Sequence, residues 1–130
     1  MTVQVVEGMR HVGAVDSFEL NRFSVFDLDG KSIGVVKTPT GFYAVLNRCP
    51  HQGANICAGR VSGTMEASDP QEFSFSSETM VAVCPWHRWE FELETGNSYG
   101  QVTDRKLMIF DVEVADGQVY VSTARKARKP

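Results

Sequence analysis

Two short segments pair a cysteine with a histidine at metal-ligand spacing. The first reads Cys49-Pro50-His51 and the second reads Cys84-Pro85-Trp86-His87, which together use two of the three cysteines and two of the three histidines. Soft thiolates and neutral imidazoles on paired loops are ligands for zinc and for iron–sulfur sites. Proline after each cysteine fixes φ and removes an amide N–H, which stiffens both loops. The spacing therefore predicts one metal site built from Cys49, His51, Cys84 and His87. Zinc and an iron–sulfur cluster are both compatible with these ligands.

Each Cys/His pair follows a predicted strand. Strands are expected over 23–28, 33–37, 42–46, 81–83, 89–93, 108–114 and 119–121, whereas helical periodicity is hard to find. Turn residues separate several of these runs, among them Asp29-Gly30, 38–41 and 115–117. In 108–114 the alternation places Met108, Phe110, Val112 and Val114 on one face. Many short strands at this spacing predict an all-β fold, an antiparallel sandwich or small barrel that presents the pairs on loops.

A polar insertion lies between the two pairs. Residues 62–79 hold five serines and four acids but no Lys or Arg. The stretch is too long and too polar for a hairpin turn, so it is predicted to be a surface excursion. Phe73 and Phe75 give it some apolar anchorage, as a small extra hairpin would have. A tolerated insertion and a role as a lid or in partner docking are both open.

Length and charge bound the remaining possibilities. The 130 residues fit one domain, predicted at 1–124, followed by a disordered basic tail at 125–130. That tail holds four of the 13 Lys and Arg residues, so residues 1–124 carry 9 basic groups against 16 acids. An acidic body argues against nucleic acid as a partner. The absence of a long apolar run or a signal-like N-terminus argues against a membrane and favours a cytoplasmic location.

The two segments resemble the cluster loops of Rieske [2Fe–2S] proteins. The likeness rests on 49–54 and 84–87, with Trp89-Glu90-Phe91 and Thr95-Gly96 after them, and with the strand pattern it extends over roughly residues 10–122. In particular, the chain resembles the small ferredoxin components of bacterial ring-hydroxylating oxygenase systems. The resemblance implies a Rieske fold with a cluster-binding part at about 47–100. It also implies a Rieske-type [2Fe–2S] cofactor, with Cys49 and Cys84 on one iron and His51 and His87 on the other.

The chain departs from the family pattern in several places. The 32-residue spacer at 52–83 is longer than usual, the extra length falling in the polar insertion, and Arg88 stands where the family has glycine. High-potential members carry an extra disulfide, but Cys57 has no spare partner, so we expect a half-buried reduced thiol. Their sulfur-bonding hydroxyls correspond here to Trp89 and Phe91. The resemblance thus predicts a potential in the lower part of the span from roughly −150 to +300 mV.

The histidine count limits the enzyme hypotheses. A catalytic mononuclear iron is commonly held by two histidines and a carboxylate, and only His11 remains after the loop histidines. No G-x-G-x-x-G fingerprint for a dinucleotide is present either. We therefore expect an electron carrier and not an enzyme. By the resemblance it is a ferredoxin passing single electrons from a flavin-containing reductase to a terminal oxygenase or another redox enzyme. Its acidic body is expected to steer it toward basic partner surfaces.

Two other functions are compatible with the same residues. One is a small Rieske-like subunit of a larger reductase of the nitrite reductase type, which predicts a permanent complex. The other is a structural zinc-binding interaction module, because zinc accepts two cysteines and two histidines in tetrahedral geometry. Colour separates the last from the others, since an iron–sulfur protein is reddish brown and a zinc protein is colourless.

Overall fold

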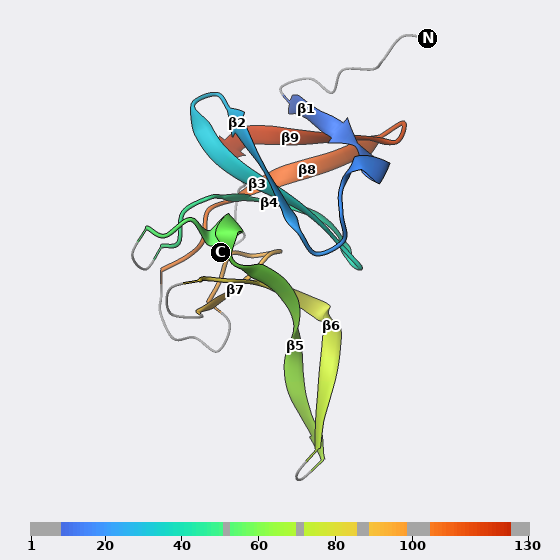
Figure 1. Cartoon of the computed structure of the whole chain (residues 1–130), viewed down its shortest axis with the longest axis vertical. Helices are drawn as coiled ribbons and strands as arrows, with labels where there is room; N and C mark the ends of the chain where they lie inside the picture. Colours follow the sequence, from blue (N-terminus) through green and yellow to red (C-terminus); the bar gives the residue numbers. More distant parts are fainter. Residues whose placement is uncertain (1–8, 51–52, 70–71, 86–88, 99–104, 126–130) are drawn as a thin grey trace.

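Antiparallel strands account for most of the protein, which confirms the all-β prediction. The computed structural model describes residues 9–50, 53–69, 72–85, 89–98 and 105–125. Within these ranges one sheet has six strands in the order β1-β9-β8-β4-β3-β2. It forms a nearly closed barrel (Figure 1). Its strands are β1 Met9–Ala14, β2 Phe23–Leu28, β3 Lys31–Thr38, β4 Gly41–Leu46, β8 Ile109–Ala115 and β9 Gln118–Arg125.

A second sheet of three strands lies beside the barrel in the order β5-β6-β7. These strands are β5 Arg60–Asp69, β6 Glu72–Val83 and β7 Glu90–Glu92. Along β6, β7 pairs with Val81–Val83, so the rest of β5 and β6 forms a long ribbon that projects from the body (Figure 1). The polar insertion at 62–79 belongs to this ribbon. It is therefore a surface hairpin, as the sequence allowed, but a longer one that extends two regular strands of the sheet.

The six-stranded sheet is buried on both faces where β3, β4 and β8 meet. Val35, Ala44 and Phe110 belong to a cluster inside the barrel. Their neighbours on the other face belong to a second cluster, between the barrel and the three-stranded sheet. Strands covered on both sides are expected to be apolar at successive positions. This explains the unbroken run of buried residues from Ile33 to Val36.

Two hairpins turn at the Asp-Gly pairs that the sequence predicts. β2 and β3 are joined by Asp29 and Gly30, with φ of 52° and 78°, and β8 and β9 by Asp116 and Gly117, with φ of 52° and 73°. Positive φ at both central residues is the type I′ geometry, whose twist matches that of paired strands. Local turn chemistry therefore fixes these two registers.

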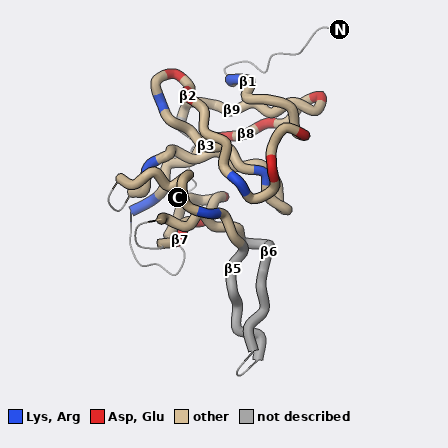
Figure 2. The backbone as a smooth tube through the Cα atoms, in the orientation of Figure 1, with Lys and Arg blue, Asp and Glu red and all other residues tan. Residues whose placement is uncertain are grey.

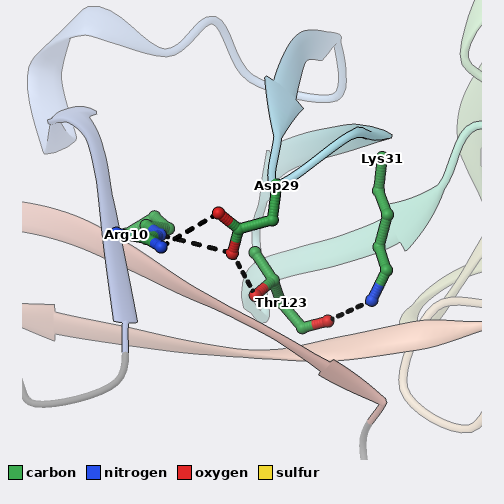
Figure 3. Close-up of polar contacts among 4 residues, drawn as sticks. All are labelled: Arg10, Asp29, Lys31 and Thr123. Carbon is green, nitrogen blue, oxygen red and sulfur yellow. Dashed lines mark hydrogen bonds and ion pairs between the residues drawn. The ribbon is translucent and has the colours of Figure 1, made fainter.

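A cluster of polar contacts, here called the turn latch, joins the β2–β3 turn to β1 and β9 (Figure 3). Arg10 Nη2 donates to Asp29 Oδ1 at 2.9 Å, and Thr123 Oγ1 donates to Asp29 Oδ2 at 2.7 Å. Lys31 Nζ donates to the Thr123 carbonyl at 2.7 Å. The hydrogen bonds from Thr123 and then Arg10 lower the pKa of Asp29 below its ordinary value. Because β1 and β2 are the two edge strands, the latch ties the open edges of the barrel together.

Two details of the C-terminal hairpin differ from the sequence prediction. Val114 is 48% exposed, whereas Ile109, assigned to the opposite face, is buried. The alternation fails because the start of β8 is covered on both faces and the register shifts between Phe110 and Val112. In addition, β9 continues through Arg125, one residue into the predicted tail, and residues 126–130 lie outside the described part. The helices in the described ranges are three-residue 3-10 turns, none of which could cross a bilayer.

Candidate functional site

The first Cys/His segment lies in a short loop closed by its own backbone. The Cys49 N–H donates to the Ala54 carbonyl at 2.7 Å, and the Gly53 N–H donates to the Cys49 carbonyl at 2.8 Å. Gly53 has a φ of 76°, a conformation that side-chain-bearing residues rarely adopt. Cys49 follows the end of β4 by three residues and is buried, with 1% of its surface exposed. His51 lies within this loop in the sequence but outside the described residues.

The second segment repeats this arrangement. The Cys84 N–H donates to the carbonyl of Trp89 at 2.8 Å, five residues further on, as Cys49 donates to Ala54. Cys84 directly follows β6 and is 2% exposed. His87 lies between the closing residues in the sequence, again outside the described part. Each candidate cysteine therefore begins a loop that a hydrogen bond from its own amide closes.

The two loops converge on one core cluster. Cys49 and Cys84 both belong to the cluster between the barrel and the three-stranded sheet, and Trp89 packs against it. The strands also bring the loops together, because Arg60, just beyond the first loop, pairs with Val83, just before the second. A Cβ on Gly59 would lie 2.0 Å from the Val83 carbonyl oxygen and 3.1 Å from Pro85 Cδ. Only glycine permits this approach.

The donor chemistry fits a thiolate-bound metal group. Both loop cysteines are buried in one core cluster, and no disulfide joins them. Within the described ranges no three His, Cys, Asp or Glu side chains are placed to hold one metal ion, and His51 and His87 lie outside those ranges. The structure thus brings the two predicted sulfur ligands into one cluster. The two predicted imidazole ligands stay predictions.

Two positions around the first loop were missed or left without a role by sequence reasoning. Asn47 Oδ1 accepts from the Cys57 N–H at 2.9 Å, and the Asn47 N–H donates to the Ser32 carbonyl at 2.9 Å, so this residue ties the loop to β3. An asparagine two residues before the first ligand was the available signal. Cys57 is free and half-buried, as expected, and it lies over Gly34, where a Cβ would be 2.1 Å from its sulfur. Burial raises the pKa of Cys57 to about 12.

Cationic side chains lie on both loops. Arg105 Nη1 donates to the Pro50 carbonyl at 3.2 Å. A Cβ on Gly53 would lie 3.5 Å from Arg48 Nη2, so the Arg48 guanidinium covers this part of the first loop. Arg60 lines a cavity of about 340 Å³ together with Ala58, Gly59, Val83, Cys84 and Pro85. The remaining histidine, His11, lies on β1, with Nε2 2.7 Å from Gln118 Oε1, and is not part of the loops.

Known proteins resemble this chain in sequence. The chain is 27% identical over 112 residues to the ferredoxin component of the alkene monooxygenase system of Xanthobacter autotrophicus, covering 86% of this chain and 79% of that protein. It is 28% identical over 94 residues to the ferredoxin CarAc of Metapseudomonas resinovorans, covering 72% and 73%.

Solved structures share the fold. The ferredoxin of carbazole 1,9a-dioxygenase from Nocardioides aromaticivorans IC177 has a TM-score of 0.70 at 23% identity, covering 89% of this chain and 98% of that one. A putative NADH-dependent nitrite reductase small subunit from Mycobacterium tuberculosis has a TM-score of 0.69 at 18% identity, covering 98% and 100%. The family model of the Rieske [2Fe-2S] domain matches residues 9–110. The chain therefore belongs to the Rieske [2Fe-2S] domain family, whose cofactor is a Rieske-type [2Fe–2S] cluster.

Proposed function

We propose that this protein is a Rieske ferredoxin that carries single electrons from a flavin-containing reductase to a terminal enzyme, with a ring-hydroxylating oxygenase as the example. The observation that carries the proposal is the pair of matched loops, each starting at a buried cysteine whose amide closes the loop on the residue five positions on. Both sequence relatives described above are ferredoxins, one from an alkene monooxygenase system. In the carbazole dioxygenase system a solved complex joins the ferredoxin to its oxygenase.

Four residues would hold the cluster. Cys49 and Cys84 would bind one iron through sulfur, and His51 and His87 would bind the other through imidazole nitrogen. When bound, the cluster accepts and releases one electron. The chain itself buries both thiols in a core cluster, which keeps water from the sulfur ligands. Three backbone hydrogen bonds, from Cys49, Gly53 and Cys84, hold the loops in shape. A rigid site changes little between redox states, which suits repeated electron transfer.

A carrier role fits the remaining residues better than a catalytic one. His11 is on β1 and bonds to Gln118, away from the two loops in the fold. Two histidines and a carboxylate are the common set for a mononuclear catalytic iron, and one histidine does not complete it. The source and the destination of the electron are therefore other proteins.

Anaerobic purification tests the proposal directly. We expect a reddish-brown protein with two irons and two acid-labile sulfides per chain, and an EPR signal that appears only on reduction. Cys49→Ala and Cys84→Ala should each abolish the cluster. The matched control Cys57→Ala removes the third thiol and should keep full iron and sulfide. A colourless protein with one zinc per chain would contradict the proposal and favour a zinc-binding module.

A small subunit of a nitrite reductase is the second candidate, favoured by a structural neighbour that this chain covers end to end. The fold alone does not separate the two functions, because both classes share it at similar TM-scores. The sequence relatives favour the ferredoxin. Size-exclusion chromatography of the protein with its genomic neighbours separates them. A transient carrier elutes alone, whereas a reductase subunit elutes in a stoichiometric complex.

A further inference from the structure

Several cationic side chains lie beside the two loops of a protein that is acidic as a whole. The chain carries a formal net charge of −3. Three exposed arginines nevertheless lie against the loops, namely Arg48, Arg60 and Arg105, with exposed Lys106 beside the last. Figure 2 shows basic segments near β7 and the start of β5, with acidic segments of β7 beside them, and both acidic and basic segments around β1 and β2. We name Arg48, Arg60 and Arg105 the arginine collar.

Each member of the collar is placed by a specific contact. Arg48 covers Gly53 in the first loop, and Arg105 donates to the Pro50 carbonyl in the same loop. Arg60 reaches the second loop, because it pairs with Val83 and lines the cavity beside Cys84. The collar therefore reaches both loops, with Arg48 and Arg105 at the first and Arg60 at the second.

Among the described residues, no acid forms an ion pair with Arg48 or Arg60. The nearest acidic residues along the three-stranded sheet are Glu90 and Glu92 on β7, both half-buried, and Glu90 shares a row with Arg60 through Val83. The ion pairs Arg10–Asp29 and Arg22–Glu19 lie elsewhere in the described ranges. These two guanidinium groups are exposed and keep their full charge for a partner.

We propose that the arginine collar is a docking surface for an acidic patch of a redox partner protein, with a partner carboxylate seated in the cavity beside Cys84. The proposal rests on the ferredoxin function and adds the chemistry of the partner surface. Arg60 on the rim of the cavity offers a planar pair of N–H donors that matches a carboxylate. Exposed Ala58 and Pro85 supply apolar walls for the methylene groups of the partner's acidic side chain.

Local charge outweighs net charge at this surface because salt screens distant groups. The Debye length is about 10 Å at 0.1 M salt, so a partner at the loops is influenced chiefly by the collar. Steering by net charge alone would instead favour a basic partner. The two cases therefore predict opposite salt dependence for a small anionic oxidant that reacts at the loops.

Oxidation of the reduced protein by hexacyanoferrate(III) distinguishes these cases. One electron leaves the reduced cluster and converts hexacyanoferrate(III) to hexacyanoferrate(II), with no proton transferred. We expect the second-order rate to fall as salt rises, and to fall by about tenfold at low salt in the double variant Arg48→Gln, Arg60→Gln. The matched control Arg22→Gln, Lys37→Gln removes the same charge from β3 and the segment before β2 and should leave the rate within about twofold.

Binding gives a second readout that does not depend on electron transfer. A hexaglutamate peptide should shift the amide NMR signals of Gly53, Gly59 and Arg60, and a hexalysine peptide should not. A rate that rises with salt, or equal effects of the two double variants, would overturn the collar. Absence of shifts with hexaglutamate would also overturn it. Iron content and colour report on the ferredoxin function separately, so a protein without a cluster contradicts that function while the peptide titration still tests the collar.

Discussion

The contact between Gly34 and Cys57 gives a prediction that can be worked from distances. Gly34 lies in β3, and a Cβ added there would stand 2.1 Å from Cys57 Sγ, 3.0 Å from Phe23 Cδ1 and 3.4 Å from Cys57 Cβ. The first distance is a severe overlap, the second is tight and the third is ordinary contact. Cys57→Ala removes only the sulfur. The substitution Gly34→Ala should therefore be severe in the wild-type background and mild in the Cys57→Ala background.

The magnitudes follow from packing. Overpacking a filled core costs about 1 to 3 kcal/mol, so we expect Gly34→Ala to cost about 2 kcal/mol. Loss of a half-buried sulfur in Cys57→Ala should cost about 1 kcal/mol, as for a small apolar group. In the double variant the new methyl group occupies the space of the lost sulfur. We expect it to be less stable than wild type by about 1 kcal/mol, a coupling of about 2 kcal/mol between the two sites.

The assay is urea unfolding of the cluster-containing protein, monitored by tryptophan fluorescence after a fixed incubation time. Loss of the cluster makes unfolding irreversible, so the four proteins are compared by their unfolding midpoints under identical conditions. At an m value of about 2 kcal/mol per M, Gly34→Ala should lower the midpoint by about 1 M, and the double variant by about half as much. Iron content should be the same in all four proteins. A double variant whose loss equals the sum of the single losses would refute the steric reasoning.

Three further predictions concern the loops, the latch and the third thiol. Gly59→Ala should lower iron and sulfide per chain, because the new Cβ must move from 2.0 Å to at least 3.0 Å from the Val83 oxygen. As the control, Gly30→Ala should lower stability but not cluster content, because a Cβ there has no atom within 4 Å but the residue has a φ of 78°. Asp29→Asn should lower the unfolding midpoint near neutral pH. The folded pKa of Asp29 is lowered from 3.8, so the wild type should be more stable than the variant above that pH. This difference in unfolding midpoint should disappear as the pH falls through the folded pKa, and a difference that grew in acid would contradict the latch. Cys57 should react with iodoacetamide much more slowly in the folded protein than after unfolding, because burial raises its pKa to about 12 and leaves little thiolate; mass spectrometry at matched pH would expose a reactive thiol.

Local signals in the sequence were enough to predict the hairpins and to single out the two cysteines that the structure brings into one core cluster. Asp29 and Asp116, each followed by glycine, adopt the positive φ that their turns require, and this depends on a few neighbouring residues alone. Cys49 and Cys84 stand out because each precedes proline and follows a strand. Their burial in one cluster confirms that the two segments belong together.

Features that depend on distant segments could not be predicted. The two-sided burial of β8 arises because a second sheet covers the outer face, and no period within residues 108–114 encodes that cover. Asn47 accepts a hydrogen bond from the Cys57 amide, 10 positions away, and Gly59 lies against the Val83 carbonyl, 24 positions away. Contacts at such separations leave no periodic pattern from which the sequence could predict them. The extra hairpin expected within 62–79 is longer than predicted and continues β5 and β6, which composition could not show, because a ribbon outside the body need not alternate apolar and polar residues.

The ribbon makes the length of the spacer almost irrelevant to metal binding. If the 32 residues between the two Cys/His pairs formed a flexible loop, closing that loop would cost conformational entropy that grows with its length. In this fold β5 and β6 run out and back, and the Arg60–Val83 rung holds their base at a fixed width. Residues can therefore be gained or lost in cross-strand pairs at the far tip while both cysteines stay in register. The length of the hairpin can therefore vary between species, or be changed by design, without a change in the geometry of the metal site.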